Sequence, residues 1–447
     1  MMRMPKRPPG FQRVLGDVLA KDQGRLDPIL HAAQRAAGDR AYLHWDKLRH
    51  KRPPTGLSHE EWWAALKMAR AGGLRTTPLL DVHGNAFRFG TPDPVPERLH
   101  EIDKSAAGNI EMSETKIANP GERDRYIIRS LMEEAITSSQ LEGAATTRRV
   151  AKEMIRSKRE PKDTSERMIL NNYLTIQRIR SISGQELTPG TLLDLHRILT
   201  RQTLEDPTAV GRFRRKDEKI TVATPYDEVL HTPPPAITLP GRLAEMCRFA
   251  NGKSPKYFIH PVIRSVMLHF WLAYDHPFVD GNGRCARALF YWSMLRQGYW
   301  LCEFISISEI IRKAPARYGR AFLYTETDEN DLTYFILYHL EVIRRAIREL
   351  HEYIAEKTAQ VRRAEQLIRA TAGLNHRQYA LLSHAIRHPD ARYTTQSHRH
   401  SHGVVNQTAR TDLLAMTDMG LLEQRKVGKR HVFTPVADLE ERLKELR

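Results

Sequence analysis

Two apolar helical patterns meet in the middle of the chain at a Gly-Asn-Gly segment, residues 281–283. The first pattern ends near Tyr274 and the second begins near Arg284. Glycines let the backbone bend so that successive N–H groups face one point, and the first turn of a helix leaves its own amides unpaired there. Because such a nest at a helix start binds anions, the sequence predicts a phosphate-binding turn between two helices.

The side chains around this turn are those that phosphate chemistry uses. Arg284 and Arg287 share one face of the second helix, where guanidinium groups can hold phosphate oxygens bidentately. Asp280 offers an oxygen ligand to a hard cation, and His276 is the one local group that can take a proton near pH 7. Each feature alone is common as a turn, a structural histidine or a solvated face. Their combination within residues 276–287 indicates phosphoryl or nucleotidyl transfer.

Residues 276–287, HPFVDGNGRCAR, resemble the signature of the Fic (Fido) family, H-[PF]-F-x-[DE]-G-N-G-R-x-x-R. The resemblance covers about residues 120–345 and includes Gly-Arg-Phe-Arg at 211–214 and His-Pro at 260–261. It implies a mostly α fold, a Fido helical core with a β-hairpin flap. It also implies an enzyme that transfers AMP from ATP, with Mg²⁺, to a Ser, Thr or Tyr hydroxyl of a target protein.

The resemblance also implies a role for each residue of the motif. His276 would deprotonate the target hydroxyl, Asp280 would hold Mg²⁺, and Arg287 would bind the γ-phosphate. The full set of implied nucleotide-binding residues is Gly281, Asn282, Gly283, Arg284, Arg287 and Tyr318. Tyr318 is a candidate wall of the adenine pocket and equally a core residue. The Gly-Asn-Gly-Arg run is similar to AMP-transferring members rather than to the phosphorylating branch, although UTP and CDP-choline users also exist.

Residues 138–143, SSQLEG, resemble the inhibitory motif of the family, [ST]-x-x-x-E-[GN]. By this resemblance Glu142 would pair with Arg287 and occupy the donor that the γ-phosphate needs. Ser138, one helical turn earlier, would cap or brace Glu142, and Gly143 would end the helix. A Glu-Gly pair is also an ordinary helix end, but its place ahead of a complete catalytic motif favours the inhibitory interpretation.

Two further segments are candidates for contacts with partners. A short hairpin over about residues 219–230 would form the flap, with Thr221 and Val222 aligning the target segment by β-augmentation. The C-terminal order of helix, turn, helix and basic hairpin is typical of a winged helix-turn-helix, and similar modules are appended to some Fic proteins. Its candidate DNA-binding residues are Gln407, Arg410, Lys429 and Arg430. Protein contact or dimerisation is the alternative role, and a histidine-rich stretch at 397–402 is expected to be an exposed loop.

Composition and charge narrow the class of protein. Hydrophobic residues make up 41% of the chain, and no stretch approaches the roughly 20 apolar residues of a membrane span. The basic N-terminus lacks the apolar segment of a secretory signal, and three cysteines without close spacing favour a reducing compartment, so we expect a cytoplasmic protein. The net charge of +17 favours anionic partners without separating nucleotides, nucleic acids and acidic proteins.

Five regions are predicted along the chain. They are an N-terminal α+β accessory region (1–105), an inhibitory helix with its helical lead-in (106–186), the Fido catalytic core (187–345), a connecting helix (346–372) and the winged helix (373–447). A homodimer is a candidate assembly. The alternative function is a nucleotide-sensing regulator that acts on DNA through the winged helix, but an intact His276 favours the enzyme because a sensor needs no base.

Overall fold

The computed structural model describes residues 3–36, 40–106, 120–224, 226–371, 373–388, 391–427 and 430–446. Two compact units form within the chain, residues 1–348 and 349–447. Helices predominate in the described residues, and the named strands there form three two-stranded sheets, which confirms the prediction of a mostly α fold. None of the described helices combines the length and the apolar composition that crossing a bilayer requires.

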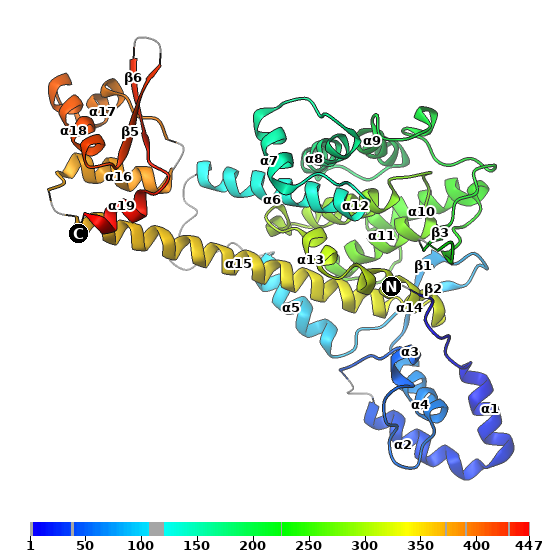
Figure 1. Ribbon diagram of the computed structural model, residues 1–447. Coiled ribbons are helices and arrows are strands. Elements are labelled where there is room, and N and C mark those ends of the chain that lie inside the picture. Colours follow the sequence, from blue (N-terminus) through cyan, green and yellow to red (C-terminus); the bar gives the residue numbers. More distant parts are fainter. Residues whose placement is uncertain are drawn as a thin grey trace. The chain divides into compact units, whose positions relative to one another are not determined.

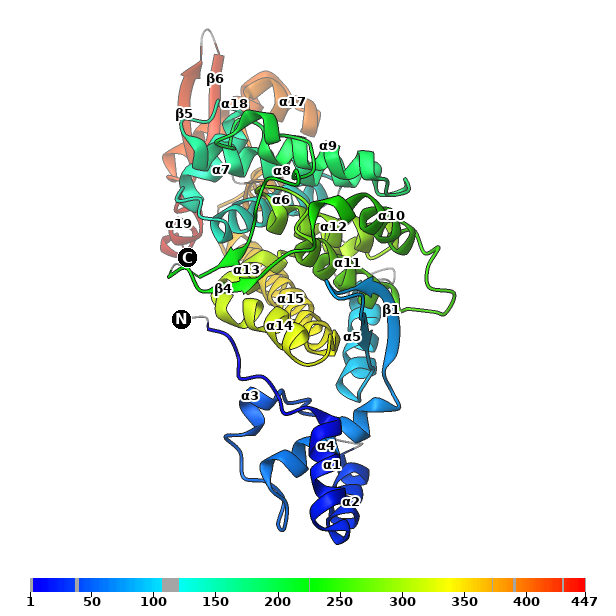
Figure 2. The same cartoon turned by 90° about the vertical axis from the view of Figure 1, so that its right-hand side faces the viewer.

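The first unit opens with a group of helices and a hairpin (Figures 1 and 2). These elements are α1 (Phe11–Lys21), α2 (Leu26–Ala36), α3 (Trp45–Leu48), α4 (His59–Ala71), β1 (Arg75–Leu80), β2 (Ala86–Phe89) and α5 (Pro94–Ala106). The central elements follow: α6 (Pro120–Leu141), α7 (Arg148–Ser157), α8 (Thr164–Ile182), α9 (Pro189–Thr200), β3 (Val222–Ala223), β4 (Val229–His231), α10 (Leu239–Ala250), α11 (Pro261–Asp275), α12 (Asn282–Arg296), α13 (Ile307–Lys313), α14 (Pro315–Thr327) and α15 (Thr333–Ala370).

Helices α11 and α12 form the centre of this unit. They pack against each other, and α12 also contacts α6, α8 and α9, while α10 lies against α11 (Figure 1). Nearly all of their side chains are buried, as expected for helices enclosed by others. Phe270, Leu272, Phe290 and Trp292 have no exposed surface. The turn between the two helices therefore lies on a rigid, fully packed base.

Local sequence signals fix the ends of several helices. Ser58 caps α4 in a capping box with Glu61, whose carboxylate accepts from the Ser58 N–H at 2.7 Å. Thr188 caps α9 by accepting from the Thr191 N–H at 3.1 Å, and Pro189 takes the first helical position. Each cap and its partner lie within a few residues of each other, so these helix ends follow from the local sequence.

The hairpin β1–β2 of the N-terminal region is built into the centre of the unit. Phe87 has no exposed surface and meets the rings of Phe270 and Tyr274 edge-on, with centroids 5.3 and 5.0 Å away. The Arg88 carbonyl accepts from the Leu332 N–H at 2.8 Å. Residues 75–89 thus supply part of the wall behind α11.

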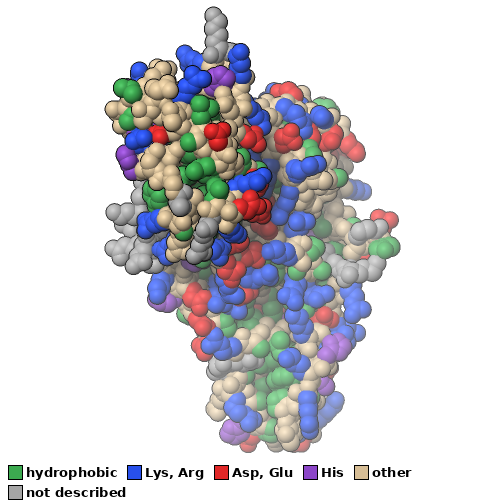
Figure 3. Space-filling view, turned by 60° about the vertical axis from the view of Figure 1, so that its left-hand side comes forward, with side chains coloured by type: hydrophobic (Ala, Val, Ile, Leu, Met, Phe, Trp, Pro, Cys, Tyr) green, Lys and Arg blue, Asp and Glu red, His purple; other side chains and the backbone are tan. Residues whose placement is uncertain are grey.

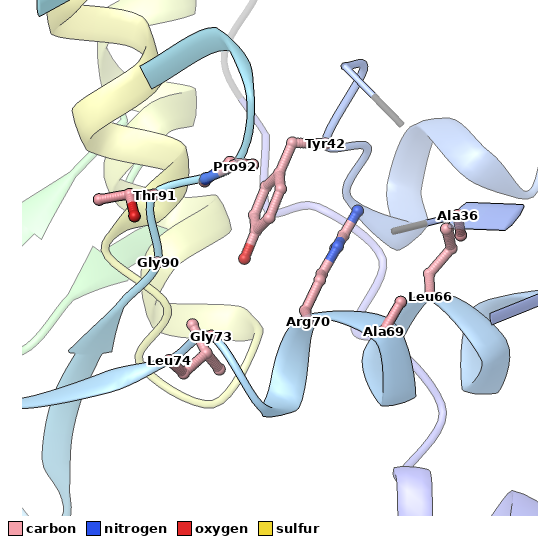
Figure 4. Close-up of a pocket in the computed structure, with 10 residues that line it drawn as sticks. All are labelled: Ala36, Tyr42, Leu66, Ala69, Arg70, Gly73, Leu74, Gly90, Thr91 and Pro92. Carbon is pink, nitrogen blue, oxygen red and sulfur yellow. The ribbon is translucent and has the colours of Figure 1, made fainter. Parts of the chain in front are cut away.

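Buried polar contacts fasten the N-terminal helices to the start of α15. Lys67 on α4 pairs with Asp328 at 2.8 Å, and the Tyr42 hydroxyl donates to Asp331 at 2.6 Å. The Arg70 guanidinium stacks on the Tyr42 ring, 3.9 Å from its centroid, beside a cavity of about 190 Å³ (Figure 4). Since each charge has a partner, the contact is held without leaving a buried ion unpaired.

The flap is shorter than the sequence predicts. Strand pairing begins at Val222, opposite His231, and the register shifts before Ala223. Thr221 precedes the strand and is exposed. The turn begins at Thr224, whose hydroxyl accepts from the N–H groups of Tyr226 and Glu228, each at 3.3 Å. Only two residues of β3 therefore belong to the ladder.

The second unit contains the end of α15 and the C-terminal elements. These are α16 (His376–Arg387), α17 (Thr395–His402), α18 (Asn406–Asp418), β5 (Leu422–Val427), β6 (Arg430–Pro435) and α19 (Leu439–Glu445). Tyr393 adds an antiparallel bridge to Phe433 of β6. Apolar residues from α15, α16, α18, α19 and both strands share one core, to which α18 contributes Leu413 and Met416. The order of elements matches the one predicted, while the assignment as a winged helix stays a prediction.

The histidine-rich stretch at 397–402 is helical, so its prediction as an exposed loop is wrong. It lies in α17, which Thr394 caps. His398 is buried, and its Nε2 lies 3.2 Å from Asp412 Oδ2. Arg377 also donates to Asp412, at 2.7 Å, so one carboxylate joins α16, α17 and α18. Lys429, a candidate DNA contact, lies outside the described residues.

Candidate active site

The turn between α11 and α12 is shaped by two left-handed residues. His276 ends α11 with φ 46° and ψ 56°, and Gly281 precedes α12 with φ 84°. The Asn282 side chain closes the turn: its Oδ1 accepts from the Phe278 N–H and its Nδ2 donates to the Phe278 carbonyl, both at 2.9 Å. The side chain of Asn282 is therefore used within the turn, and its backbone N–H is what remains for a phosphate.

His276 is a neutral imidazole, and only one of its two ring nitrogens contacts the backbone of α11. Its Nδ1 lies 3.2 Å from the Ala273 carbonyl. Because a carbonyl only accepts, Nδ1 carries the hydrogen and Nε2 keeps a lone pair. Burial lowers the pKa of His276 to about 4. At neutral pH the ring is thus in the form that accepts a proton.

Two residues that hold this turn were missed at the sequence level. Arg214 donates from Nε to the His276 carbonyl at 2.8 Å, and its backbone N–H donates to the Pro277 carbonyl at 2.8 Å. The His196 ring stacks on Phe278 with centroids 3.8 Å apart. The Gly-Arg-Phe-Arg segment at 211–214 is only part of the family resemblance, and a lone histidine inside α9 carries no signal.

His196 also fixes the position of the carbonyl just before the glycine nest. Its Nδ1 accepts from the Gly211 N–H at 3.0 Å, so Nε2–H donates to the Asp280 carbonyl at 3.0 Å. Burial lowers the pKa of His196 to about 4, which keeps this tautomer over the neutral range. The chain segment before the flap and the turn of the motif are thereby linked.

Arg284 and Asp280 form an ion pair at the mouth of the turn. Arg284 Nη2 donates to Asp280 Oδ2 at 3.1 Å; the arginine side chain has no exposed surface, whereas that of Asp280 is 56% exposed. Arg284 Nε is buried without a hydrogen-bond partner among the described residues. A buried unpaired donor beside an open carboxylate suits a site that binds a phosphate with its metal ion.

Arg287 forms its side-chain hydrogen bonds with residues at the end of α6 and just beyond it. Its Nε donates to Ser138 Oγ at 2.8 Å, and its Nη2 donates to the Ser138 carbonyl at 3.0 Å and to Glu142 Oε1 at 2.8 Å. The structure thus brings Glu142 and Arg287 together. Ser138 and Glu142 thus share Arg287 as a partner, and the expected brace between the two stays a prediction.

Glu142 lies past the last residue of α6, where the chain reverses at Gly143 with φ 96°. Its Oε1 is so near Gly283 that a methyl group on Gly283 would overlap it. The carboxylate therefore lies over the first turn of α12, where the backbone amides favour an anion. Glu142 occupies with its own charge the place suited to a phosphate.

Helix α6 itself is firmly attached to the core. The buried Glu134 accepts from the Tyr291 hydroxyl at 2.9 Å, from Ser306 Oγ at 2.8 Å, and from Ser308 Oγ at 2.5 Å. These bonds join α6 to α12 and to the start of α13. No local pattern marks Glu134, because its partners are far away along the chain.

Tyr318, the remaining nucleotide candidate, lies on α14 behind Arg287. Its hydroxyl is 2.8 Å from His269 Nε2 on α11. Burial raises the pKa of Tyr318 to about 12, and the charge of Arg287 opposes that rise. The hydroxyl of Tyr318 is thus engaged by His269, and the side chain is not among the exposed ones.

Residues 186–294 match the model of the Fic/DOC family. The chain contains a Fic/DOC domain. This Fic domain includes His276, Asp280, Arg284 and Arg287, whereas Glu142 precedes it in the sequence.

Curated relatives of the domain carry the name protein adenylyltransferase Fic. The protein from Drosophila willistoni is 35% identical over 117 residues, which are 26% of this chain and 21% of the relative. The protein from Drosophila erecta is 34% identical over 130 residues, 28% of this chain and 23% of the relative. The match thus spans about a fifth of the length of these relatives.

Among solved structures, Fic-1 from C. elegans is 16% identical with a TM-score of 0.49, over 79% of this chain and 90% of that one. A Fic family protein from Desulfovibrio desulfuricans is 20% identical with a TM-score of 0.48, over 76% of this chain and 94% of that one.

Proposed function

We propose that the protein is an autoinhibited adenylyltransferase that transfers AMP from ATP to a Ser, Thr or Tyr hydroxyl of a target protein. The observation that carries the proposal is the neutral His276 beside two buried arginines and a glycine nest, within a Fic domain. The name of the curated relatives supports AMP as the transferred group.

The neutral imidazole suits His276 to act as general base. Its Nε2 would take the proton of the target hydroxyl while the hydroxyl oxygen forms a bond to the α-phosphorus. The bond from the α-phosphorus to the bridging oxygen would break, and pyrophosphate would leave. Mg²⁺ held by Asp280 and the phosphates would supply charge neutralisation for the leaving group.

The remaining residues of the motif would bind and orient the nucleotide. The N–H groups of Gly281, Asn282 and Gly283 would face the α-phosphate, since the start of α12 leaves such groups without intrahelical acceptors. Arg284 would contact the α- and β-phosphates, and Arg287 would bind the γ-phosphate. The flap at Val222, with Thr221 beside it, would align the target segment.

We infer that the resting protein is inhibited by Glu142. The carboxylate accepts a hydrogen bond from Arg287 and lies against Gly283. A γ-phosphate would therefore lose this donor and would be repelled by the negative charge of Glu142. ATP could then bind only in a pose unsuited to in-line attack. Gly143 permits the chain reversal that brings Glu142 to this position.

One experiment tests the function directly. The Glu142→Gly protein is incubated with cell lysate and Mg²⁺ with ATP, UTP or CTP, each labelled on the α-phosphate, beside a Glu142→Gly/His276→Ala control. The proposal expects label from ATP on lysate proteins, lost with His276→Ala. Label from UTP or CTP alone would show that the protein transfers UMP or CMP and not AMP. No label from any of the three nucleotides would contradict the proposed nucleotide transfer.

A second candidate function is regulation of transcription, through binding of DNA by the second unit. Gln407 and Arg410 at the start of α18 are exposed, as is Arg430 of β6. Figure 3 shows Lys and Arg side chains gathered along the hairpin, where Arg425 and Lys426 are also exposed. Basic side chains on a helix start and a hairpin suit contact with a nucleic acid backbone. The enzyme remains the first proposal, because a regulator that only senses a nucleotide would not need a base such as His276.

A further inference from the structure

The flap is too short to be held in place by its own pairing. Strand β3 contributes two residues and β4 three, and an isolated two-stranded hairpin is at best marginally stable in water. Leu230 is the one buried apolar side chain of the two strands, while Val222 is half-buried and Val229 is exposed. Contacts with the rest of the unit must therefore fix where the flap lies.

His231, the last residue of β4, makes such contacts through both nitrogens of its ring. Its Nδ1 lies 2.7 Å from Glu326 Oε2 on α14, and its Nε2 lies 2.7 Å from the carbonyl of Tyr274 in the last turn of α11. Figure 2 shows β4 beside α14. In the part of the chain that the structure describes, the side-chain hydrogen bonds from β3 and β4 to other elements all come from this ring. His231 is also the cross-strand partner of Val222, so one side chain ties the flap to the helix that leads into His276.

Both contacts require a hydrogen on the ring of His231. A backbone carbonyl only accepts, so Nε2 carries a hydrogen, and an ionised carboxylate only accepts, so Nδ1 carries one as well. The carbonyl end of α11 also favours a cation at this place. Burial opposes the charge, but the hydrogen bond and the charge of Glu326 outweigh it and raise the pKa of His231 above its usual value. The ring is therefore an imidazolium paired with Glu326.

The other charged groups near the ring leave Glu326 as its ion-pair partner. Asp275 is buried and pairs with Arg242 at 2.6 Å. A cavity of about 300 Å³ lies beside the ring. Besides Glu326, the titratable and charged groups that surround the ring are Arg7, Asp81, His83, Arg242, Asp275 and His276. Because loss of the proton from Nδ1 would leave the carboxylate facing a lone pair, the contact weakens as the pH rises through the pKa of His231.

We propose that His231 is a positioning residue for the target protein: its imidazolium fastens the flap to α11 and α14, and so fixes a docked target segment relative to His276. This rests on the proposed function, in which the flap aligns the target. Without the contact, the target would have to order the flap as it binds, which weakens binding and leaves the nucleotide chemistry unchanged. The role predicts a higher KM for the target, with kcat and ATP affinity nearly unchanged.

The test uses full-length Glu142→Gly as the parent, with His231→Gln, Glu326→Gln and His83→Gln added singly. The labelling rate of the strongest lysate band is followed against lysate concentration, and ATP binding is measured by calorimetry. Since His231→Gln reaches only one of the two acceptors, its half-saturating lysate concentration should rise about tenfold, the effect of one hydrogen bond to a charged group. Its limiting rate and ATP affinity should stay close to those of the parent. His83→Gln, at an exposed position that lines the same cavity, is the control and should match the parent.

Glu326→Gln separates the charge of the contact from its shape. A glutamine amide can donate to Nδ1 of a neutral ring while Nε2–H still donates to the Tyr274 carbonyl, so the flap stays fastened. Between pH 7 and 9.5 the half-saturating concentration of the parent should rise relative to that of Glu326→Gln, because only the parent depends on the proton at Nδ1. A ratio that does not change with pH would overturn the imidazolium.

Hydrogen exchange in peptides that cover β3 and β4, read by mass spectrometry at pH 7, keeps the two proposals distinguishable. His231→Gln should exchange faster there than the parent, whether or not any protein is labelled. Equal exchange in the two proteins, or equal lysate curves, would overturn the inference and leave the proposed function standing. A parent that labels no protein removes the proposed function, and with it the role of His231 in docking, even where exchange responds as expected.

Discussion

Arg287 donates to Glu142 at 2.8 Å, but the two side chains differ in environment: the guanidinium side chain is 2% exposed and the carboxylate side chain 29%. Arg287 also keeps two hydrogen bonds to Ser138 that do not involve Glu142. Departure of Glu142 therefore removes one contact and leaves the arginine supported in place. The contact between Glu142 and Arg287 can therefore be broken while the rest of the site stays in place.

Glu142→Gly should raise AMP incorporation. The substitution removes one charge-assisted hydrogen bond to a buried arginine, which contributes about 1.5–3 kcal/mol. This free energy corresponds to a rise of roughly 10- to 100-fold in the rate at limiting ATP. Labelling with α-labelled ATP measures the change. Glu142→Gln keeps the shape and removes the charge, so it should lie between wild type and Glu142→Gly. Equal labelling by all three proteins would contradict the inhibitory role.

Ser138→Ala should lower activity once Glu142 is absent. The substitution removes the acceptor of Arg287 Nε and leaves a buried donor unpaired, which costs about 1–3 kcal/mol. In the Glu142→Gly protein we expect KM for ATP to rise at least fivefold, read from labelling rates across ATP concentrations. A purely inhibitory Ser138 predicts no loss in this background. Ser139→Ala, whose hydroxyl bonds to the Met168 carbonyl instead, is the matched control.

The rate of labelling should stay constant as the pH is lowered from neutral to values well below 6.5. The pKa of His276 is lowered to about 4, so the imidazole remains a base until the pH falls toward that value. Initial rates of the Glu142→Gly protein between pH 4.5 and 8, with circular dichroism at each pH to verify folding, measure this. A half-maximal rate between pH 6 and 7 would show that the free enzyme holds a base with an ordinary pKa.

Phe87→Ala should destabilise the first unit by about 3–5 kcal/mol, because a fully buried ring leaves a cavity against Phe270 and Tyr274. Urea unfolding followed by circular dichroism gives the change. Val82→Ala, at an exposed position between the same two strands, is the control and should change stability by less than about 0.5 kcal/mol. Similar midpoints for wild type and Phe87→Ala would show that the hairpin is not part of the core.

DNA binding by the second unit should depend on salt and on its exposed arginines. Each phosphate contact contributes about 0.9 to the slope of log affinity against log salt concentration. Arg410→Ala and Arg430→Ala should each weaken binding of the full chain to duplex DNA and lower that slope by about 0.9. Fluorescence anisotropy at several salt concentrations measures both. Unchanged slopes in both variants would favour protein contact over DNA for this unit.

What the sequence could predict follows from the distance between interacting residues along the chain. Helix ends such as those at Ser58 and Thr188 depend on partners three residues away, so their patterns are visible in one sequence. The motif at 276–287 is also contiguous, and Glu142 was accessible through a second family pattern.

The missed residues share a different property. Arg214 is 62 residues from the carbonyl it holds, and Glu134 is 174 residues from Ser308. Nothing in a short window marks a buried Glu or Arg as paired, because its partner is chosen by packing. The histidine stretch at 397–402 misled for the same reason, since Asp412, which engages His398, lies outside it.

The firm attachment of α6 through Glu134 has a consequence for control of the proposed activity. An activator does not have to pull a helix away from the core, since the residues that must move begin after Leu141. A ligand or partner that captures residues 142–147 would change activity by shifting a local equilibrium of a short segment. Sensitivity would then be set by how often that segment opens, and substitutions there could retune the enzyme over a wide range without cost to its folding.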